Sequence, residues 1–108
     1  MFNWFKTSNT TSDKIQSLVN QNAPVIDVRT PQEFAQGHIK GSVNVPLNHL
    51  FASIKQLKKL EQPLLLVCRS GARAGQAQRL LMEGGIDSIN GGSWQDVNNM
   101  ILSAKEVH

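Results

Sequence analysis

The sequence predicts a small α/β domain built around a central, mostly parallel sheet. Three features point to this class: strand-like and helix-like segments alternate, their connections are short, and residues 64–67 are apolar at every position. A strand that faces water on one side alternates apolar and polar residues, whereas a continuous apolar run indicates burial on both faces. Right-handed crossovers would then place helices on both faces of the sheet.

The N-terminal quarter of the chain predicts one helix and one strand. Thr11 or Ser12 can cap a short helix, in which apolar residues recur at helical spacing between positions 15 and 19. Ala23-Pro24 ends this helix, and the apolar residues that follow predict a strand at 25–28.

A capping box begins the second predicted helix. Thr30 precedes Pro31, and Glu33 occupies the third helical position, which is the pattern of a capped helix start. Gly37 ends this helix, and residues 43–46 predict a second, shorter strand.

The second half of the chain predicts the remaining elements. Asn48 can cap a lysine-bearing helix that runs toward Leu60. After the buried strand we expect, in order, a helix at 74–83, a short strand at 88–89 and a helix that begins at Trp94. Residues 90–92 form a glycine turn before the last helix.

Length and composition exclude several classes of protein. With 108 residues we expect a single domain over 1–108, with a core from about residue 11 to 100 and flexible ends. The longest apolar run is far shorter than the roughly 18 residues of a membrane span, so no membrane partner is expected. Residues 1–6 lack a secretory signal, and a single cysteine excludes an intramolecular disulfide. A cytoplasmic location is therefore expected.

The charge pattern and the spacing of the histidines further limit which kinds of partner are expected. The net charge is +3, and the one lysine cluster, Lys55, Lys58 and Lys59, is expected on the solvated face of its helix rather than in a docking patch for an acidic partner. No aromatic residues are interleaved with the basic ones, so a nucleic-acid partner is not expected. The three histidines lack the spacing of metal ligands, and we predict neither a metal nor a cofactor.

The loop after the buried strand carries the residues best suited to catalysis. Cys68 directly follows the strand, where open α/β sheets bind their ligands. Unpaired N–H groups and the dipole of the next helix would stabilise a thiolate there. An inert core cysteine would need neither Gly71, which permits a tight loop, nor two nearby arginines. We therefore predict Cys68 as the nucleophile, with a substrate-binding loop of Arg69, Ser70, Gly71, Ala72 and Arg73.

Taken together, these tracts resemble the single-domain rhodanese family of sulfurtransferases. The matching tracts fall in family order from about residue 11 to 100: Asp27-Val28-Arg29, Glu33-Phe34, Gly37-His38-Ile39, Gly41 with Asn44-Val45-Pro46, Cys68-Arg69-Ser70-Gly71-Ala72-Arg73, and Asn90-Gly91-Gly92 before Trp94. The resemblance implies a three-layer α/β fold with a central, mostly parallel sheet flanked by helices. One departure is Ala74, where many relatives have serine, which leaves the donor preference open.

The resemblance also implies a ping-pong transfer of sulfur. A small anionic donor such as thiosulfate would leave a persulfide on Cys68, and a thiophilic acceptor such as cyanide or a thiol would remove it. Two alternatives stay open: a module that delivers persulfide to a protein acceptor, and a phosphatase or arsenate reductase. The second is disfavoured because four residues separate Cys68 from Arg73, whereas the related phosphatases have five.

Four upstream residues are expected to support the site rather than to react. Arg29, Glu33 and His38 are expected to form a buried ion or hydrogen-bond network, in which Glu33 pairs with Arg29; substrate contact is the weaker interpretation. Asp27 could instead orient the active-site loop by accepting its backbone N–H groups. The glycines at 91 and 92 are expected to form a turn that borders the pocket.

Overall fold

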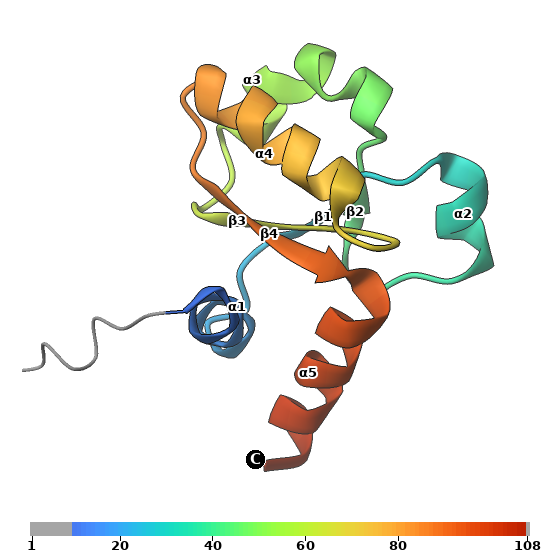
Figure 1. Ribbon diagram of the computed structural model, residues 1–108, viewed down its shortest axis with the longest axis vertical. Coiled ribbons are helices and arrows are strands. Elements are labelled where there is room, and N and C mark those ends of the chain that lie inside the picture. The colour runs from blue at the N-terminus through green and yellow to red at the C-terminus, as the bar shows by residue number, and fades with distance from the viewer. Residues whose placement is uncertain (1–9, 108) are drawn as a thin grey trace, which may run out of the picture.

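The computed structural model describes residues 10–107 and confirms the predicted α/β class (Figure 1). The expected flexible start and the segment 1–6 lie outside the described residues. In chain order the elements are α1 (Thr11–Asn20), β1 (Val25–Asp27), α2 (Pro31–Gln36), β2 (Val43–Asn44), the 3₁₀ turns η2 (Leu47–His49) and η3 (Phe51–Ser53), α3 (Ile54–Leu57), β3 (Leu64–Cys68), α4 (Ala72–Glu83), β4 (Ser88–Ser93) and α5 (Trp94–Val107).

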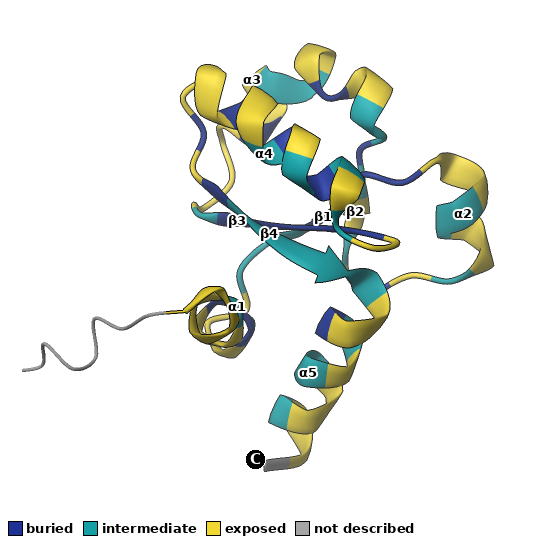
Figure 2. Ribbon diagram, viewed as in Figure 1, coloured by how far each residue is buried: buried dark blue, intermediate teal, exposed yellow. Residues whose placement is uncertain are grey.

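A four-stranded parallel sheet forms the middle layer. Its strand order is β2-β1-β3-β4, so β3 lies between two neighbours. Helices α3 and α4 cover one face, and α1 and α5 cover the other (Figure 1). Every residue of β3 is at most 1% exposed, as the continuous dark ribbon in Figure 2 shows. The prediction of a strand buried on both faces is therefore confirmed.

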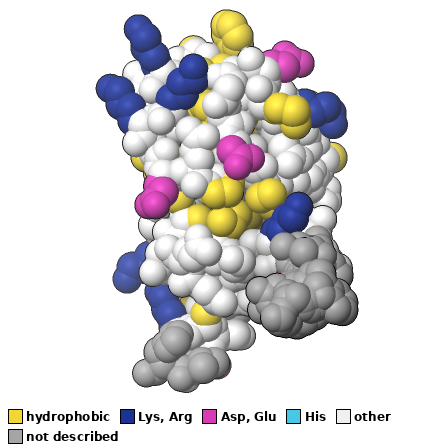
Figure 3. Space-filling view, turned by 90° about the vertical axis from the view of Figure 1, so that its left-hand side faces the viewer, with side chains coloured by type: hydrophobic (Ala, Val, Ile, Leu, Met, Phe, Trp, Pro, Cys, Tyr) yellow, Lys and Arg dark blue, Asp and Glu magenta, His cyan; other side chains and the backbone are white. Residues whose placement is uncertain are grey.

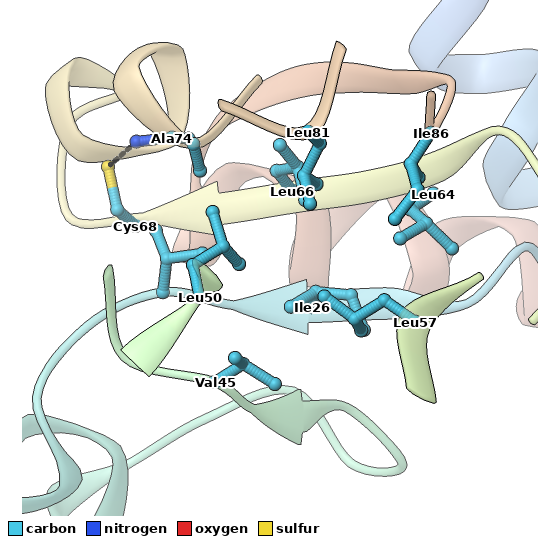
Figure 4. Close-up of a cluster of buried hydrophobic side chains, with 12 residues drawn as sticks. Ile26, Val45, Leu50, Leu57, Leu64, Leu66, Cys68, Ala74, Leu81 and Ile86 are labelled. Carbon is cyan, nitrogen blue, oxygen red and sulfur yellow. Dashed lines mark hydrogen bonds between the residues drawn. The ribbon is translucent and has the colours of Figure 1, made fainter. Parts of the chain in front are cut away.

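Side chains of β3 alternate between two separate cores. Leu64, Leu66 and Cys68 belong to the cluster beneath α4, whereas Leu65 and Val67 belong to the cluster beneath α1 and α5. Successive side chains of a strand point to opposite faces, so the position of Cys68 in this alternation decides where its sulfur lies. Figure 4 shows Cys68 at the end of the α4-side cluster. The sulfur is thereby directed toward the start of α4.

The first helix begins one residue earlier than expected. Thr10, rather than Thr11 or Ser12, is the N-cap of α1: its hydroxyl accepts the backbone N–H of Asp13, and the Asp13 carboxylate accepts the N–H of Thr10. A reciprocal pair of this kind satisfies two N–H groups that a helix start leaves unpaired. Asp13 determines which residue is the N-cap, because a capping box joins the N-cap to the third helical residue and Thr10 lies three positions before Asp13.

The expected lysine-bearing helix is broken into η2, η3 and the four-residue α3, and Asn48 caps none of them. Leu47, Leu50, Ile54 and Leu57 all pack against the α4-side core, at spacings of three and four residues. Contact with the core, rather than a cap, sets the path of this segment. Its lysines, Lys55, Lys58 and Lys59, are exposed, as a solvated face requires.

The glycine turn expected at 90–92 is wrong, because these residues belong to β4. Gly91 lies so close to β3 that a side-chain carbon placed on it would be 2.9 Å from the carbonyl oxygen of Leu66. Its lack of a side chain therefore permits close pairing of two strands. The last strand runs to Ser93, beside Cys68, instead of ending at residue 89.

Within the described chain, no helix is long and apolar enough to cross a bilayer. Figure 3 shows the side of the molecule away from the carboxyl ends of the strands. Basic side chains gather at its upper left, while acidic side chains flank the hydrophobic ones nearer its centre. The described part of this face thus lacks the continuous basic stripe that follows a nucleic-acid backbone.

Candidate active site

The junction of β3 and α4 places Cys68 at the carboxyl edge of the sheet. Cys68 is the last residue of β3 and α4 begins at Ala72, so three residues connect the elements, the last of them the N-cap Gly71. Gly71 has a φ of 104°, a left-handed conformation that residues with a side chain rarely adopt. This turn carries the chain back over the end of β3 within one loop.

Two backbone N–H groups meet the cysteine sulfur. The N–H of Gly71 donates to Cys68 Sγ at 2.9 Å, and the N–H of Ala74 donates to it at 3.4 Å (Figure 4). Both belong to the first turn of a 12-residue helix, whose positive dipole end adds to their effect. The sulfur thus faces two backbone hydrogen-bond donors and the positive end of a helix dipole. Ala74 supplies this N–H while its methyl group lies in the core.

The remaining loop residues lie at the surface. Arg69, Ser70 and Ala72 are exposed, whereas Arg73 is half-buried in the first turn of α4. Arg69 has no carboxylate partner within residues 10–107. The loop thus presents one uncompensated positive charge beside the cysteine.

Arg73 pairs with Glu33 rather than with the loop. Its guanidinium donates to the two carboxylate oxygens of Glu33 at 2.6 and 3.0 Å, which ties the start of α4 to α2. These hydrogen bonds, followed by one from the backbone N–H of Thr30, lower the pKa of Glu33 to about 2. Because Glu33 neutralises it, Arg73 does not offer the free positive charge that the sequence predicted.

The expected pair between Arg29 and Glu33 is wrong, because Arg29 pairs with Asp27. Arg29 Nε lies 2.9 Å and Nη2 2.8 Å from the two carboxylate oxygens of Asp27, and the pair is buried. The backbone N–H of Arg29 also donates to Asp27, whose carboxylate accepts none from the active-site loop. Asp27 ends β1 and Arg29 follows two residues later, and this short separation was the available signal.

His38 lies outside this buried pair, which corrects the expected network. It is exposed, its ring stacks on Phe34 with centroids 3.7 Å apart, and its Nδ1 lies 2.7 Å from the Phe34 carbonyl oxygen. Arg29 instead reaches the Gly37 carbonyl at 2.7 Å and lies 4.8 Å above the Trp94 ring. A flat guanidinium can make both contacts at once.

A polar cleft of about 360 Å³ lies beside the loop. Its lining includes Arg29, Glu33, Gln36, Arg69, Trp94 and Gln95. Since the charges of Arg29 and Glu33 are paired, the net charge presented by this lining is that of Arg69, and an anion is the fitting ligand. Gln36, Trp94 and Gln95 were missed by sequence reasoning; the start of α5 directly after β4 was the only signal for the last two. Within residues 10–107, no cluster of His, Cys, Asp and Glu could hold a metal ion.

Fold and site together define a class: an α/β protein with a cysteine at a helix start, hydrogen-bonded by two backbone N–H groups, beside a cleft suited to anions. The chain matches the rhodanese-like domain family over residues 11–99. It is 33% identical over 100 residues to "Thiosulfate sulfurtransferase GlpE" of Pseudomonas aeruginosa, covering 88% of this chain and 90% of that protein. It is 36% identical over 69 residues to "Uncharacterized protein YqhL" of Bacillus subtilis, covering 64% of this chain but 54% of that protein.

A solved structure agrees with these matches. The rhodanese from Escherichia coli, solved with anions, superposes with a TM-score of 0.63 at 30% identity, over 68% of this chain and 89% of the other. The chain therefore belongs to the rhodanese-like family, as its motifs indicated. It is an enzyme of the sulfurtransferase class.

Replacing Arg29 by alanine is expected to lower the free energy of unfolding by roughly 3–5 kcal/mol, because the buried carboxylate of Asp27 loses its partner. Urea unfolding at pH 7 measures the loss. Changing Asp27 to asparagine in the same chain should restore part of it, since no unpaired charge is then buried. An Arg29→Ala protein that unfolds like the wild type but has lost activity would place Arg29 in the chemistry.

Replacing Glu33 by glutamine is expected to change the acid stability of the protein. The folded pKa of Glu33 is depressed to about 2 from an ordinary 4.5, so its contribution is complete above pH 4.5 and is lost as the pH falls toward 2. Between pH 6 and pH 3, the wild type should lose more stability than Glu33→Gln, by about 1 kcal/mol or less, because the pair is partly exposed. Equal losses in urea titrations at the two pH values would contradict the role of the pair.

Proposed function

We propose that this enzyme moves sulfane sulfur from thiosulfate, or a similar small anionic donor, to cyanide or a thiol through a persulfide on Cys68. The observation that carries the proposal is the convergence of the Gly71 and Ala74 N–H groups on Cys68 Sγ. Negative charge rests on this sulfur before the reaction and on the neighbouring sulfur after it. Donors held in place for such charge act without reorganising during the reaction.

In the first step, the Cys68 thiolate attacks the outer sulfur of thiosulfate. A new S–S bond forms to Cys68, the S–S bond of thiosulfate breaks, and sulfite leaves with the electron pair of that bond. The persulfide carries one negative charge, as the thiolate did, and the sulfite dianion carries the other two. No proton, oxidant or reductant is consumed in this step.

In the second step, cyanide attacks the terminal sulfur of the persulfide. Thiocyanate forms, the persulfide S–S bond breaks, and its electron pair returns to Cys68 as a thiolate. A thiolate acceptor would receive the sulfur in the same way and become a persulfide itself. The terminal persulfide sulfur needs a site for its charge between the two steps, and the start of α4 supplies backbone N–H groups and a positive dipole end.

The other loop residues have distinct parts in this proposal. Arg69 attracts the anionic donor into the cleft, and Gly71 gives the loop its turn. Ser70 and Ala72 complete the substrate-binding loop, and Arg73 holds the start of α4 through Glu33. Asp27 and Arg29 act indirectly, because their ion pair fixes the end of β1 beside the cleft. A free thiol of this kind persists in a reducing compartment, which supports a cytoplasmic site of action.

The length of the loop supports sulfur transfer over phosphate chemistry. Two N–H groups already lie within 3.4 Å of the sulfur, and four residues separate Cys68 from Arg73. A tetrahedral oxyanion placed above the thiolate needs a wider ring of N–H donors than a single sulfur atom does. We therefore expect no hydrolysis of an aryl phosphate by this enzyme.

Replacing Cys68 by serine is expected to abolish sulfur transfer, by about 1,000-fold or more, while the fold stays intact. A hydroxyl is not ionised near neutral pH and cannot form a persulfide, and the chain has no second thiol. Thiocyanate release measures turnover, and intact-mass spectrometry after thiosulfate should show one added sulfur atom on the wild type alone. Aryl phosphate hydrolysis that disappears in Cys68→Ser would instead assign the cysteine to phosphate chemistry.

Replacing Arg69 by alanine is expected to raise the KM for thiosulfate about fivefold at low salt, with a smaller effect on kcat. The attraction lost is between exposed charges, so the difference from wild type should shrink as salt screens it. Arg79→Ala is the matched control, because Arg79 is an exposed arginine farther along α4, outside the cleft lining. An equal rise in KM for both variants would show that net charge matters and the position of Arg69 does not.

A further inference from the structure

Asn90 makes contacts that the proposed chemistry does not use. It lies in β4 with a half-buried side chain. Its Nδ2 donates to the carbonyl oxygen of Gly71 at 3.0 Å, and its Oδ1 accepts the backbone N–H of Gly92 at 2.9 Å. The amide group therefore connects the last strand to the active-site loop, with both of its polar atoms engaged.

The hydrogen bond from Asn90 ends on Gly71, the residue whose N–H contacts the sulfur. The carbonyl of Gly71 accepts from Asn90, while the N–H of the same residue donates to Cys68 Sγ at 2.9 Å. Gly71 has no side chain and adopts a left-handed conformation, so its backbone by itself has wide freedom. A hydrogen bond on one side of this residue therefore restricts the direction of the N–H on the other side.

The backbone around Asn90 leaves room for its side-chain amide. A side-chain carbon placed on Gly75 would lie 3.3 Å from Asn90 Nδ2, and one placed on Gly71 would lie 3.7 Å from Asn90 Oδ1. Glycine inside a helix such as α4 weakens that helix relative to alanine. The missing side chain of Gly75 leaves space for the Asn90 amide between the loop and the first turn of α4.

We propose that Asn90 is a positioning residue for Cys68: it holds the Gly71 peptide so that its N–H stays directed at the sulfur, and it thereby sets the reactivity of the thiolate. Asn90 makes no hydrogen bond to the sulfur and does not line the cleft, so its route to the sulfur is through Gly71. The inference rests on Cys68 reacting as a thiolate, as the proposed function requires. It adds a specific residue that determines how strongly that thiolate is favoured.

The test follows alkylation of Cys68 by iodoacetamide as a function of pH in the wild type, Asn90→Ala and Asn90→Asp. Cys68 is the only cysteine, so alkylation measured by intact mass reports this one thiol. Weakening a hydrogen bond to the sulfur should slow alkylation at neutral pH in Asn90→Ala by about fivefold. Asn90→Asp should slow it at least as much. Aspartate has the same shape and can still accept from Gly92, but its carboxylate cannot donate to the Gly71 carbonyl.

Gln78→Ala is the matched control. Gln78 also ties α4 to β4, by donating from Nε2 to the Ser88 carbonyl at 3.1 Å, and that bond is not part of the sulfur's surroundings. Loss of the Gln78 hydrogen bond should lower stability against urea, as loss of the Asn90 hydrogen bonds should. It should leave the alkylation profile of Cys68 unchanged. The comparison separates positioning of the N–H from general loosening of the contact between α4 and β4.

Two outcomes would overturn the inference. One is an unchanged alkylation profile in folded Asn90→Asp, the variant that best keeps the shape of the site. The other is an equal shift in Gln78→Ala. Alkylation requires no sulfur donor, so an enzyme that fails to use thiosulfate would contradict the proposed function and leave this test intact. If the enzyme transfers sulfur normally but the alkylation profile of folded Asn90→Asp is unchanged, only the proposed role of Asn90 is wrong.

Discussion

Hydrogen bonding to the buried Cys68 sulfur at the end of β3 is the constraint on which the rest of the site depends. Cys68 is 1% exposed, so its hydrogen-bond partners must come from the protein rather than from water. The first turn of α4 has N–H groups with no partner inside the helix, and two of them reach the sulfur. The short loop and the left-handed Gly71 are the means of bringing that turn over the end of the strand.

Two ion pairs decide which charges remain for a substrate. Asp27 neutralises Arg29 within the protein, and Glu33 neutralises Arg73 between α2 and α4. Arg69 is left as the one uncompensated charge on the cleft lining beside the cysteine. A single exposed arginine attracts a small anion more weakly than several free arginines would.

The cleft is assembled from segments that are far apart in the sequence. The stretch from Arg29 to Gly37 supplies one wall, Arg69 comes from the loop, and Trp94 and Gln95 come from the start of α5. Parallel strands bring these segments together, because their carboxyl ends lie at one edge of the sheet. The contacts of Arg29 with Gly37 and Trp94 then join the two sides of the cleft.

Local patterns were sufficient to predict the fold class and the position of the loop that carries Cys68. The continuous apolar run ending at Cys68 indicated a central strand, and the Thr30 and Glu33 capping box located a helix start, because both patterns depend on near neighbours in the chain. The pairing of Arg29 with Asp27, of Arg73 with Glu33, and of Asn90 with Gly71 was decided by the tertiary structure. Arg29 has two carboxylates close by in the chain, Asp27 and Glu33, whereas Glu33 is 40 residues from its partner Arg73, so only the folded chain selects the pairs. Gly91 shows the same dependence on tertiary structure. In sequence Gly91 and Gly92 indicate a turn, but both belong to β4, and Gly91 lies so close to β3 that a side chain would not fit.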